Sequence, residues 1–236
     1  MAGYQAIEDT IAKAFELRRR PIAIAFKDAA PAGIAKFAGT VPSGCSFWRI
    51  AAEGATFYTV PSDHYNCAVG SHTHNIELPK ERADELEQTI SFMTTMHYFR
   101  KEEIPGFARL LKTPGVVVYA PLGDTPVDPD VVLFVERPAR ISLLMEAASR
   151  AGIGAKAPFL GRPTCSALAA ALAEGAVVST ACMGNRVYTD LGEDELYAAI
   201  RGSDMKRLAE EAHTIADANR QLTEYHRARR KELATR

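Results

Sequence analysis

Two segments of the sequence resemble each other, and this similarity constrains the fold more than any other feature. GCSFWRIAAEGATFYTV begins at residue 44 and TCSALAAALAEGAVVST begins at residue 164. Each reads as Cys-Ser at a helix start, an alanine-rich helix, Glu-Gly at its end and then a β-branched strand. A further strand precedes each unit, IAIAF in the first half and VVLFV in the second. We therefore predict an α/β fold of two similar halves, related by a pseudo-two-fold axis and packed as one compact unit.

Local signals agree with this division. Gly54 and Gly175 fit the left-handed position that closes a helix, while Ser43 and Pro163 fit signals at a helix start. The turn-rich segment GDTPVDPD is the best boundary in the chain, and no low-complexity linker accompanies it. We expect a single domain with two closely packed lobes, residues 1–125 and 126–236.

Helical periodicity marks three further segments. The first covers residues 4–20 and stops before Pro21, and the second runs from Leu78 to about Phe99. The third is a long amphipathic C-terminal helix whose apolar side chains include Leu208 and Leu222. This helix is expected to pack on the domain or on a second copy of the chain, which would give a homo-oligomer.

Composition excludes several classes of partner. The sequence has 28 Lys and Arg against 29 Asp and Glu, so its overall charge attracts neither nucleic acid nor an acidic membrane surface. It has no apolar signal core and no apolar run long enough for a membrane span. We expect a cytoplasmic protein, and in that reducing compartment its four cysteines indicate metal ligands, catalytic groups or buried thiols rather than disulfides.

The cysteines occur as one matched pair in each half. Cys45 and Cys165 stand in the first turn of the two predicted helices, where free N–H groups and the helix dipole favour a low thiol pKa. A pseudo-two-fold axis would bring Cys45 towards Cys165 and Cys67 towards Cys182. Arg49 lies one helical turn after Cys45 and could stabilise its thiolate or hold an anion.

The segment around Cys67, DHYNCAVGSHTH, is dense in groups that can bind a metal. It lacks the Cys-x-x-Cys pairs of strong zinc sites, so its zinc signal is weak. We expect His72 and His74 to lie in a solvated loop. His64, three residues before Cys67, is the better candidate for a hydrogen bond to a cluster sulfur.

Cys182 opens the segment CMGNRVYTDLGEDELYAAI, which follows a predicted strand and is expected to lead into a helix. Gly184 and Asn185 suit a turn with positive φ that aims backbone N–H groups at an anion, and Arg186 adds a cationic fork. The chain contains no nucleophile elbow, Walker loop, GxGxxG fingerprint or HExxH pair. Standard hydrolase, nucleotide-binding and zincin functions therefore lose support.

At these segments the chain resembles the bacterial and archaeal family called domain of unknown function 169. The resemblance spans nearly the whole sequence and rests on PIAIAF, GCSFWRIA, DHYNC, VDPDVVLF, PTCSALA and CMGNR. It implies that cysteines at all four positions form a shared site, and it names no reaction. GSHTHN after Cys67 departs from the glycine-rich continuation expected in many relatives, which leaves the part of this loop in ligand choice open.

Our leading hypothesis is that one 4Fe-4S cluster lies between the two halves in a redox or electron-transfer protein, with a redox partner. Its ligands would be Cys45, Cys67, Cys165 and Cys182, because four thiolates are the usual complement of such a cluster. Three alternatives stay open at this point. They are a four-cysteine zinc site, a thiol enzyme whose Arg49 or Arg186 binds an anionic substrate, and a small-molecule-binding module.

Overall fold

The computed structural model describes residues 3–154 and 159–234. Within them, seven strands form one sheet in the order β2-β3-β1-β4-β7-β6-β5. All neighbouring strands are antiparallel except β5 and β6. The strands are β1 (Ile22–Lys27), β2 (Phe57–Thr59), β3 (Val116–Pro121), β4 (Val131–Glu136), β5 (Phe159–Leu160), β6 (Ala176–Ser179) and β7 (Leu196–Arg201).

Two strands expected from the sequence, β1 and β4, pair at the centre of the sheet. Their antiparallel pairing is centred on Ala23, which faces Val132. Ile22 faces Leu133 on one side of this pair, and Ile24 faces Val131 on the other. Outward from this centre, β3 and then β2 follow on one side, and β7 and then β6 follow on the other. The α/β fold is thus confirmed. The strand order is the one a duplication would give, and superposition of the two halves stays a prediction.

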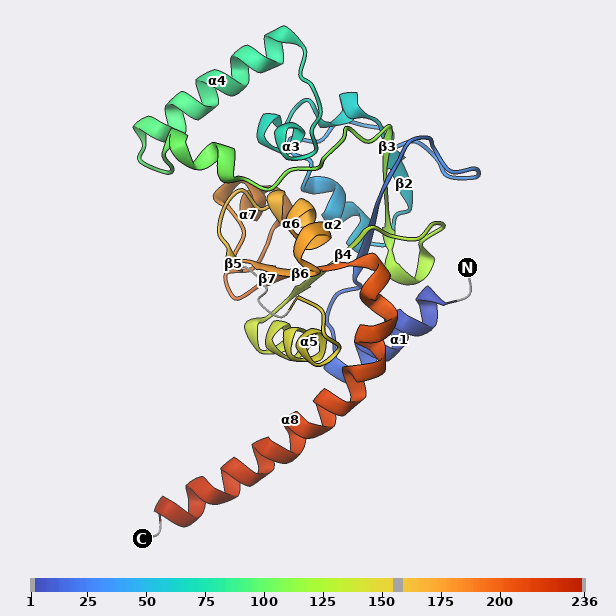
Figure 1. Ribbon diagram of the computed structural model, residues 1–236, viewed down its shortest axis with the longest axis vertical. Coiled ribbons are helices and arrows are strands. Elements are labelled where there is room, and N and C mark those ends of the chain that lie inside the picture. Colours follow the sequence, from blue (N-terminus) through green and yellow to red (C-terminus); the bar gives the residue numbers. More distant parts are fainter. Residues whose placement is uncertain (1–2, 155–158, 235–236) are drawn as a thin grey trace.

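Helices cover both faces of the sheet (Figure 1). The face that carries the cysteines is covered by α2, α3, α6 and α7, and the opposite face by α1, α5 and α8. The bounds are α1 (Tyr4–Phe15), α2 (Ser46–Ala52), α3 (Ala68–Thr73), α4 (Lys80–Thr95), α5 (Pro138–Arg150), α6 (Ser166–Glu174), α7 (Met183–Thr189) and α8 (Met205–Ala234).

Alternation along the strands produces one core on each face. Successive side chains of a strand point to opposite faces, so Ile22 and Ile24 join the core beneath α2 and α6. Ala23, between them, joins the core beneath α1, α5 and α8. Cys45 and Cys165 belong to the first of these cores. These two cysteines therefore lie in the protein interior, whereas Cys67 and Cys182 are partly exposed.

The structure corrects two expected helix ends. α1 stops at Phe15 because Glu16 adopts a left-handed conformation with φ of 51°, several residues before Pro21. α4 stops at Thr95 and does not reach Phe99, since His97 has φ of 56°.

The helix expected after Cys182 is α7 and ends at Thr189, so the following segment DELYAAI does not continue it and contains strand β7 instead. Glu195, which precedes the strand, is 3% exposed and accepts a hydrogen bond of 2.9 Å from the Arg19 guanidinium. β7 itself fills the place between β4 and β6. Tertiary pairing therefore overrides the helical pattern of the local sequence.

The C-terminal helix α8 begins on the sheet and then runs out of the body of the protein (Figure 1). Its buried residues are Met205, Leu208 and Ala212, all near its start. Leu222 and Tyr225, further along, are exposed. The helix is thus amphipathic where it packs, and homo-oligomer formation through it stays a prediction. Among helices of the described ranges, none combines the length and apolar character needed to span a membrane.

Candidate functional site

All four cysteines occupy the same local position, the residue immediately before a helix. Cys45 precedes α2 and Cys165 precedes α6, as the sequence predicts. Cys67 precedes α3 and Cys182 precedes α7 in the same way. Backbone N–H groups at a helix start have no partner within the helix, so a sulfur placed there can accept from them. The Cys67 sulfur does so, from the N–H of Gly70 at 3.3 Å.

The expectation of low pKa values for the two helix-start thiols is wrong. Cys45 is 5% exposed and Cys165 is 6% exposed. Burial raises the pKa of Cys45 to about 12, and it raises the pKa of Cys165 well above its ordinary value. Loss of hydration penalises the thiolate more than the start of a short helix stabilises it. Without a ligand, these two groups are neutral thiols.

The four sulfurs are electrostatic neighbours. After burial, the charge of Cys67 and then that of Cys182 act to raise the pKa of Cys45. Charges on Cys45, Cys67 and Cys182 act in the same direction on the pKa of Cys165. The fold thus gathers thiols from four helices and from both halves of the sequence on one side of the sheet.

A hydroxyl near the first cysteine of each half connects it to the second. Ser43 accepts a hydrogen bond from the Cys45 N–H at 3.3 Å and donates to the Cys67 sulfur at 3.5 Å. Thr164, next to Cys165, accepts from the Cys182 N–H at 2.6 Å. The sequence presents Ser43 as a helix-start signal only, so this connecting role was not predicted.

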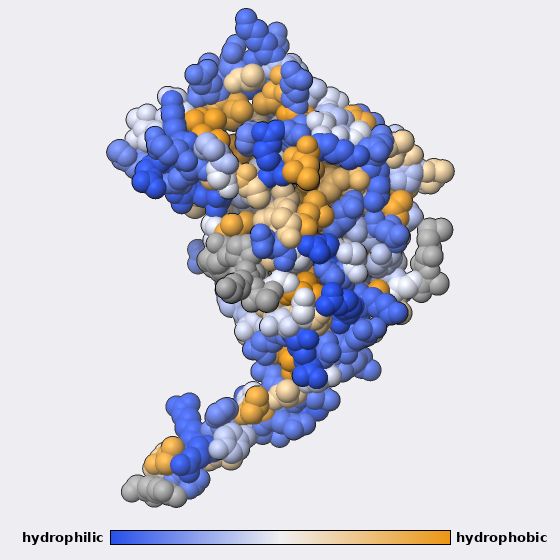
Figure 2. All heavy atoms as spheres, in the orientation of Figure 1, coloured by the Kyte–Doolittle hydropathy of each residue, from blue (hydrophilic) through white to orange (hydrophobic). Residues whose placement is uncertain are grey.

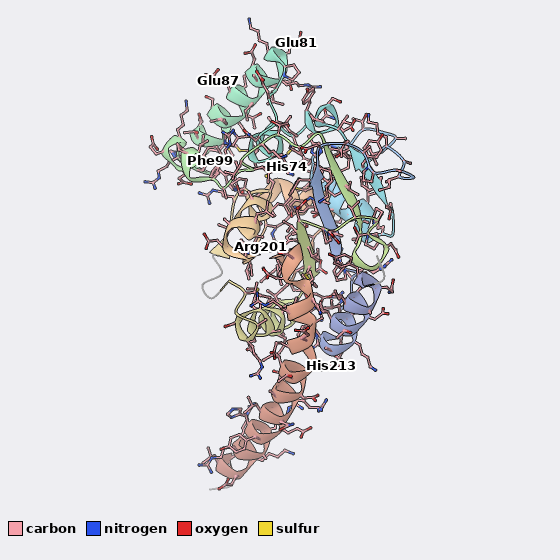
Figure 3. The ribbon with its side chains drawn as sticks, turned by 45° about the vertical axis from the view of Figure 1, so that its right-hand side comes forward. His74, Glu81, Glu87, Phe99, Arg201 and His213 are labelled. Carbon is pink, nitrogen blue, oxygen red and sulfur yellow. The ribbon has the colours of Figure 1, made fainter. Side chains whose placement is uncertain are left out.

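Two buried histidines lie beside Cys67. His64 and His74 are 1% and 4% exposed, and their ring centroids are 5.4 Å apart. The expected solvated position is therefore wrong for His74, which lies inside the body of the protein (Figure 3), while His72 is partly buried. Burial, and then the neighbouring His74, lower the pKa of His64 to about 3, and burial also lowers the pKa of His74. Both rings are neutral at physiological pH.

Neutral rings leave nitrogen atoms unused on this face. His74 Nδ1 donates to the Gly70 carbonyl at 2.8 Å, and His64 Nε2 and the Thr59 hydroxyl are 2.8 Å apart. Within the described ranges, His64 Nδ1 and His74 Nε2 have no hydrogen-bond partner. A Cβ added at Gly44, next to Cys45, would lie 3.3 Å from His64 Nδ1. The free nitrogen of His64 is thus adjacent to the backbone of the Cys45 segment.

Asn185 is the most unusual polar residue of the site. It is 1% exposed, and neither its amide nitrogen nor its amide oxygen makes a hydrogen bond of ordinary geometry with the residues described. Its amide nevertheless lies beside the Cys45 sulfur and the Tyr197 hydroxyl, since it acts to lower the pKa of both. The buried Ser166 hydroxyl and Trp48 indole N–H also lack partners there. Of these groups, the Asn185 amide is the one that acts directly on a cysteine sulfur, that of Cys45.

The family model of domain of unknown function 169, described as uncharacterised ArCR, matches residues 10–211. The chain belongs to this family. The matched residues include all four cysteines and end within α8. No curated protein and no solved structure matches the chain. In this member of the family, the described residues contain no set of three or more His, Cys, Asp or Glu side chains arranged to hold a single metal ion.

The two arginines predicted to serve the site have other contacts in this family member. Arg49 pairs with Glu53 at 2.9 Å and also with Asp190, so it connects α2 to the end of α7. Arg186 donates to two backbone carbonyls, those of Thr180 at 2.5 Å and Gly192 at 3.1 Å. These bonds hold the loop around Cys182. Anion binding by either arginine stays a prediction.

The turn with positive φ that was expected at Gly184 and Asn185 is wrong. Both residues belong to α7, which begins directly after Cys182. Positive φ occurs instead at Ala181, the residue before this cysteine, with φ of 68°. The consequence is that Asn185 lies one helical turn after Cys182 and presents its side chain, rather than its backbone, to the site.

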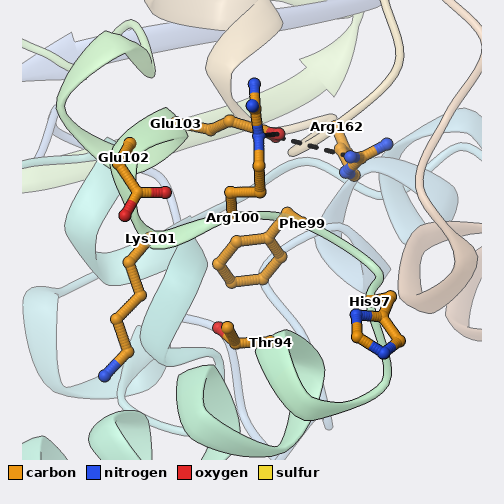
Figure 4. A pocket seen from close by; sticks show the side chains of 8 residues that line it. All are labelled: Thr94, His97, Phe99, Arg100, Lys101, Glu102, Glu103 and Arg162. Carbon is orange, nitrogen blue, oxygen red and sulfur yellow. Dashed lines mark hydrogen bonds and ion pairs between the residues drawn. The ribbon is translucent and has the colours of Figure 1, made fainter.

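A hollow of about 560 Å³ adjoins the cysteine site (Figure 4). Tyr98 connects the two, because its hydroxyl accepts a hydrogen bond of 3.2 Å from the N–H of Met183, next to Cys182. Arg162, three residues before Cys165, places its guanidinium 5.0 Å from the centre of the Tyr98 ring. The hollow is lined by Thr94, His97, Phe99, Arg100, Lys101, Glu102, Glu103 and Arg162.

Proposed function

We propose that this protein binds one 4Fe-4S cluster between α2, α3, α6 and α7 and uses it to transfer electrons. The ligands are Cys45, Cys67, Cys165 and Cys182. The observation that carries the proposal is that four thiols, each preceding a different helix, lie near enough for the other cysteines to act on the pKa of Cys165, and for Cys67 and Cys182 to act on that of Cys45. Four cysteine thiolates are the usual ligand set of such a cluster. A cytoplasmic location and a redox partner protein are parts of this proposal.

Buried polar groups without hydrogen-bond partners support the presence of a polar ligand at this position. Leaving a buried donor or acceptor without a partner costs about 1–3 kcal/mol per group. In the described part of the chain, such atoms include the amide nitrogen of Asn185, the Ser166 hydroxyl and His64 Nδ1. The sulfide and cysteinyl sulfur atoms of a cluster accept hydrogen bonds, so donors of this set would find partners there.

A cluster and a single zinc ion require different spacings between the four cysteine sulfurs. Zinc bound by four thiolates at about 2.3 Å requires sulfurs roughly 4 Å apart in a tetrahedron. No described set of side chains has the compact arrangement needed around one ion. A 4Fe-4S cluster places an iron atom in front of each cysteine and holds the four sulfurs further apart. The compact tetrahedron of a zinc site is thus the less favoured of the two, and the cluster stays the proposal because it uses one cysteine for each of its four iron atoms.

A thiol enzyme is less well supported. A nucleophilic cysteine needs a thiolate near neutral pH, whereas burial raises the pKa of both Cys45 and Cys165. Metal binding displaces the thiol proton and compensates for the burial of the thiolate. Raised pKa values in the free protein therefore agree with metal ligation and disagree with attack by these two sulfurs.

Anaerobic purification tests the proposal. We expect brown protein with four iron and four acid-labile sulfide per chain, and bleaching of the visible absorption by dithionite. If the purified protein is colourless and contains one equivalent of zinc, the proposal of a cluster is replaced by that of a structural zinc site. Metal-free protein after anaerobic reconstitution with iron and sulfide would remove the proposal altogether.

A further inference from the structure

The hollow next to Tyr98 has an unusual arrangement of charge. Arg100 and Arg162 both pair with the Glu103 carboxylate, at 3.2 and 3.4 Å. One carboxylate thus pairs with two guanidinium groups, and both distances are long for charge-assisted hydrogen bonds. Lys101 also lines the hollow, and it has no acidic partner in the described part of the chain. With Glu102 as the remaining acid, the lining keeps an excess of positive charge.

The rest of the lining is suited to an organic group. Phe99 is 8% exposed and packs edge to face against Phe107, with ring centroids 6.4 Å apart. Figure 4 shows its ring between Arg100, Thr94 and His97. Figure 2 shows apolar side chains gathered on the face between α4 and the body of the protein. The volume of the hollow is in the range of small-molecule sites, but most of its lining side chains are charged, which favours a charged ligand over an apolar one.

We propose that this hollow binds a small organic carboxylate, and that Glu103 occupies the position of the ligand carboxylate while the site is empty. Arginine pairs recognise a carboxylate through charge-assisted hydrogen bonds, and Glu103 presents that same group to both. The ligand would displace Glu103 towards solvent, which its partial exposure permits. This inference goes beyond the cluster and does not depend on it.

The location gives such a ligand a direct relation to the cysteine site. Arg162 is in the segment that leads to Cys165, and Tyr98 contacts the backbone next to Cys182. Thr164 connects these two cysteine segments through the Cys182 N–H. A carboxylate in the hollow would therefore be connected to both cysteine segments through Arg162 and Tyr98.

Calorimetric titration tests the proposal with acetate, succinate and benzoate as carboxylate probes and inorganic phosphate as a separate probe. We expect at least one carboxylate to bind at millimolar concentration. Arg162→Gln should weaken it about tenfold, the loss expected for one charge-assisted pair. Glu103→Gln should tighten it several-fold, because the competing internal carboxylate is removed. Arg150→Gln, which breaks an exposed pair with Glu211 on another helix, is the matched control and should leave binding unchanged.

Several outcomes overturn the inference. They are the absence of binding by all three carboxylates, binding of phosphate alone, and equal binding in Arg162→Gln. Weaker binding in Glu103→Gln would also contradict it, since a purely structural Glu103 would weaken the site when lost. Iron content is measured on the same samples. The proposal of a carboxylate site and the proposal of a cluster can therefore be rejected independently of each other.

Discussion

Replacing Cys45 or Cys165 by alanine is expected to abolish incorporation of the cluster, and the same holds for Cys67 and Cys182. Each thiolate would bind one iron atom, so its loss leaves that iron without a protein ligand. The cluster-free fold should survive, since removal of a buried thiol costs about 1 kcal/mol. Iron and sulfide content after anaerobic reconstitution measures the effect, and circular dichroism checks the fold.

Ser142→Ala is a suitable control for this series. Ser142 lies exposed on α5, on the opposite side of the sheet from the cysteines. Its substitution should leave iron and sulfide at the level of the unmodified protein. Retention of the full cluster in any one of the four cysteine variants would exclude that residue as an essential ligand.

The second large effect is expected at Asn185. Asn185→Leu keeps the side-chain volume and removes the amide that lies beside the Cys45 sulfur. Loss of an outer hydrogen bond to a metal ligand typically costs 10–100-fold in affinity, so the variant should release iron to a chelator about tenfold faster or more. In the cluster-free protein the same substitution is expected not to destabilise the fold. Removing a buried amide without ordinary hydrogen bonds should leave stability unchanged or raise it by about 1 kcal/mol.

This difference separates a role at the cluster from a role in folding. Asn219→Leu, at an exposed position of α8, is the control and should change neither the chelation rate nor the unfolding midpoint. Equal chelation rates in Asn185→Leu and the unmodified protein would show that the amide does not serve the cluster. Destabilisation of the cluster-free variant would assign Asn185 to the packing of α7.

Sequence patterns predict the elements that local chemistry specifies. The Cys-Ser and Glu-Gly signals correctly mark α2 and α6, and both Gly54 and Gly175 have positive φ. The strands β1 and β4 were expected from their apolar runs. These features depend on residues within a few positions of one another, which is the range that a sequence pattern covers.

Long-range packing decides the features that were missed. The thiol pKa of Cys45 follows from burial beneath the whole helical layer, which a helix-start argument cannot include. His74 is buried with one ring nitrogen bonded to Gly70, although its local sequence is polar. Strand β7 depends on its neighbours β4 and β6, and Thr73 approaches Cys165 only because α3 packs on α6. No local signal identifies these contacts.

An anaerobic crystal structure with anomalous data collected on both sides of the iron absorption edge tests the central claim most directly. The account predicts an iron peak enclosed by the sulfurs of Cys45, Cys67, Cys165 and Cys182, resolved into a four-iron cluster at sufficient resolution. Asn185 should donate to a sulfur of that centre. An anomalous peak at the zinc edge alone, iron bound elsewhere, or four sulfurs enclosing no metal in reconstituted protein would contradict it.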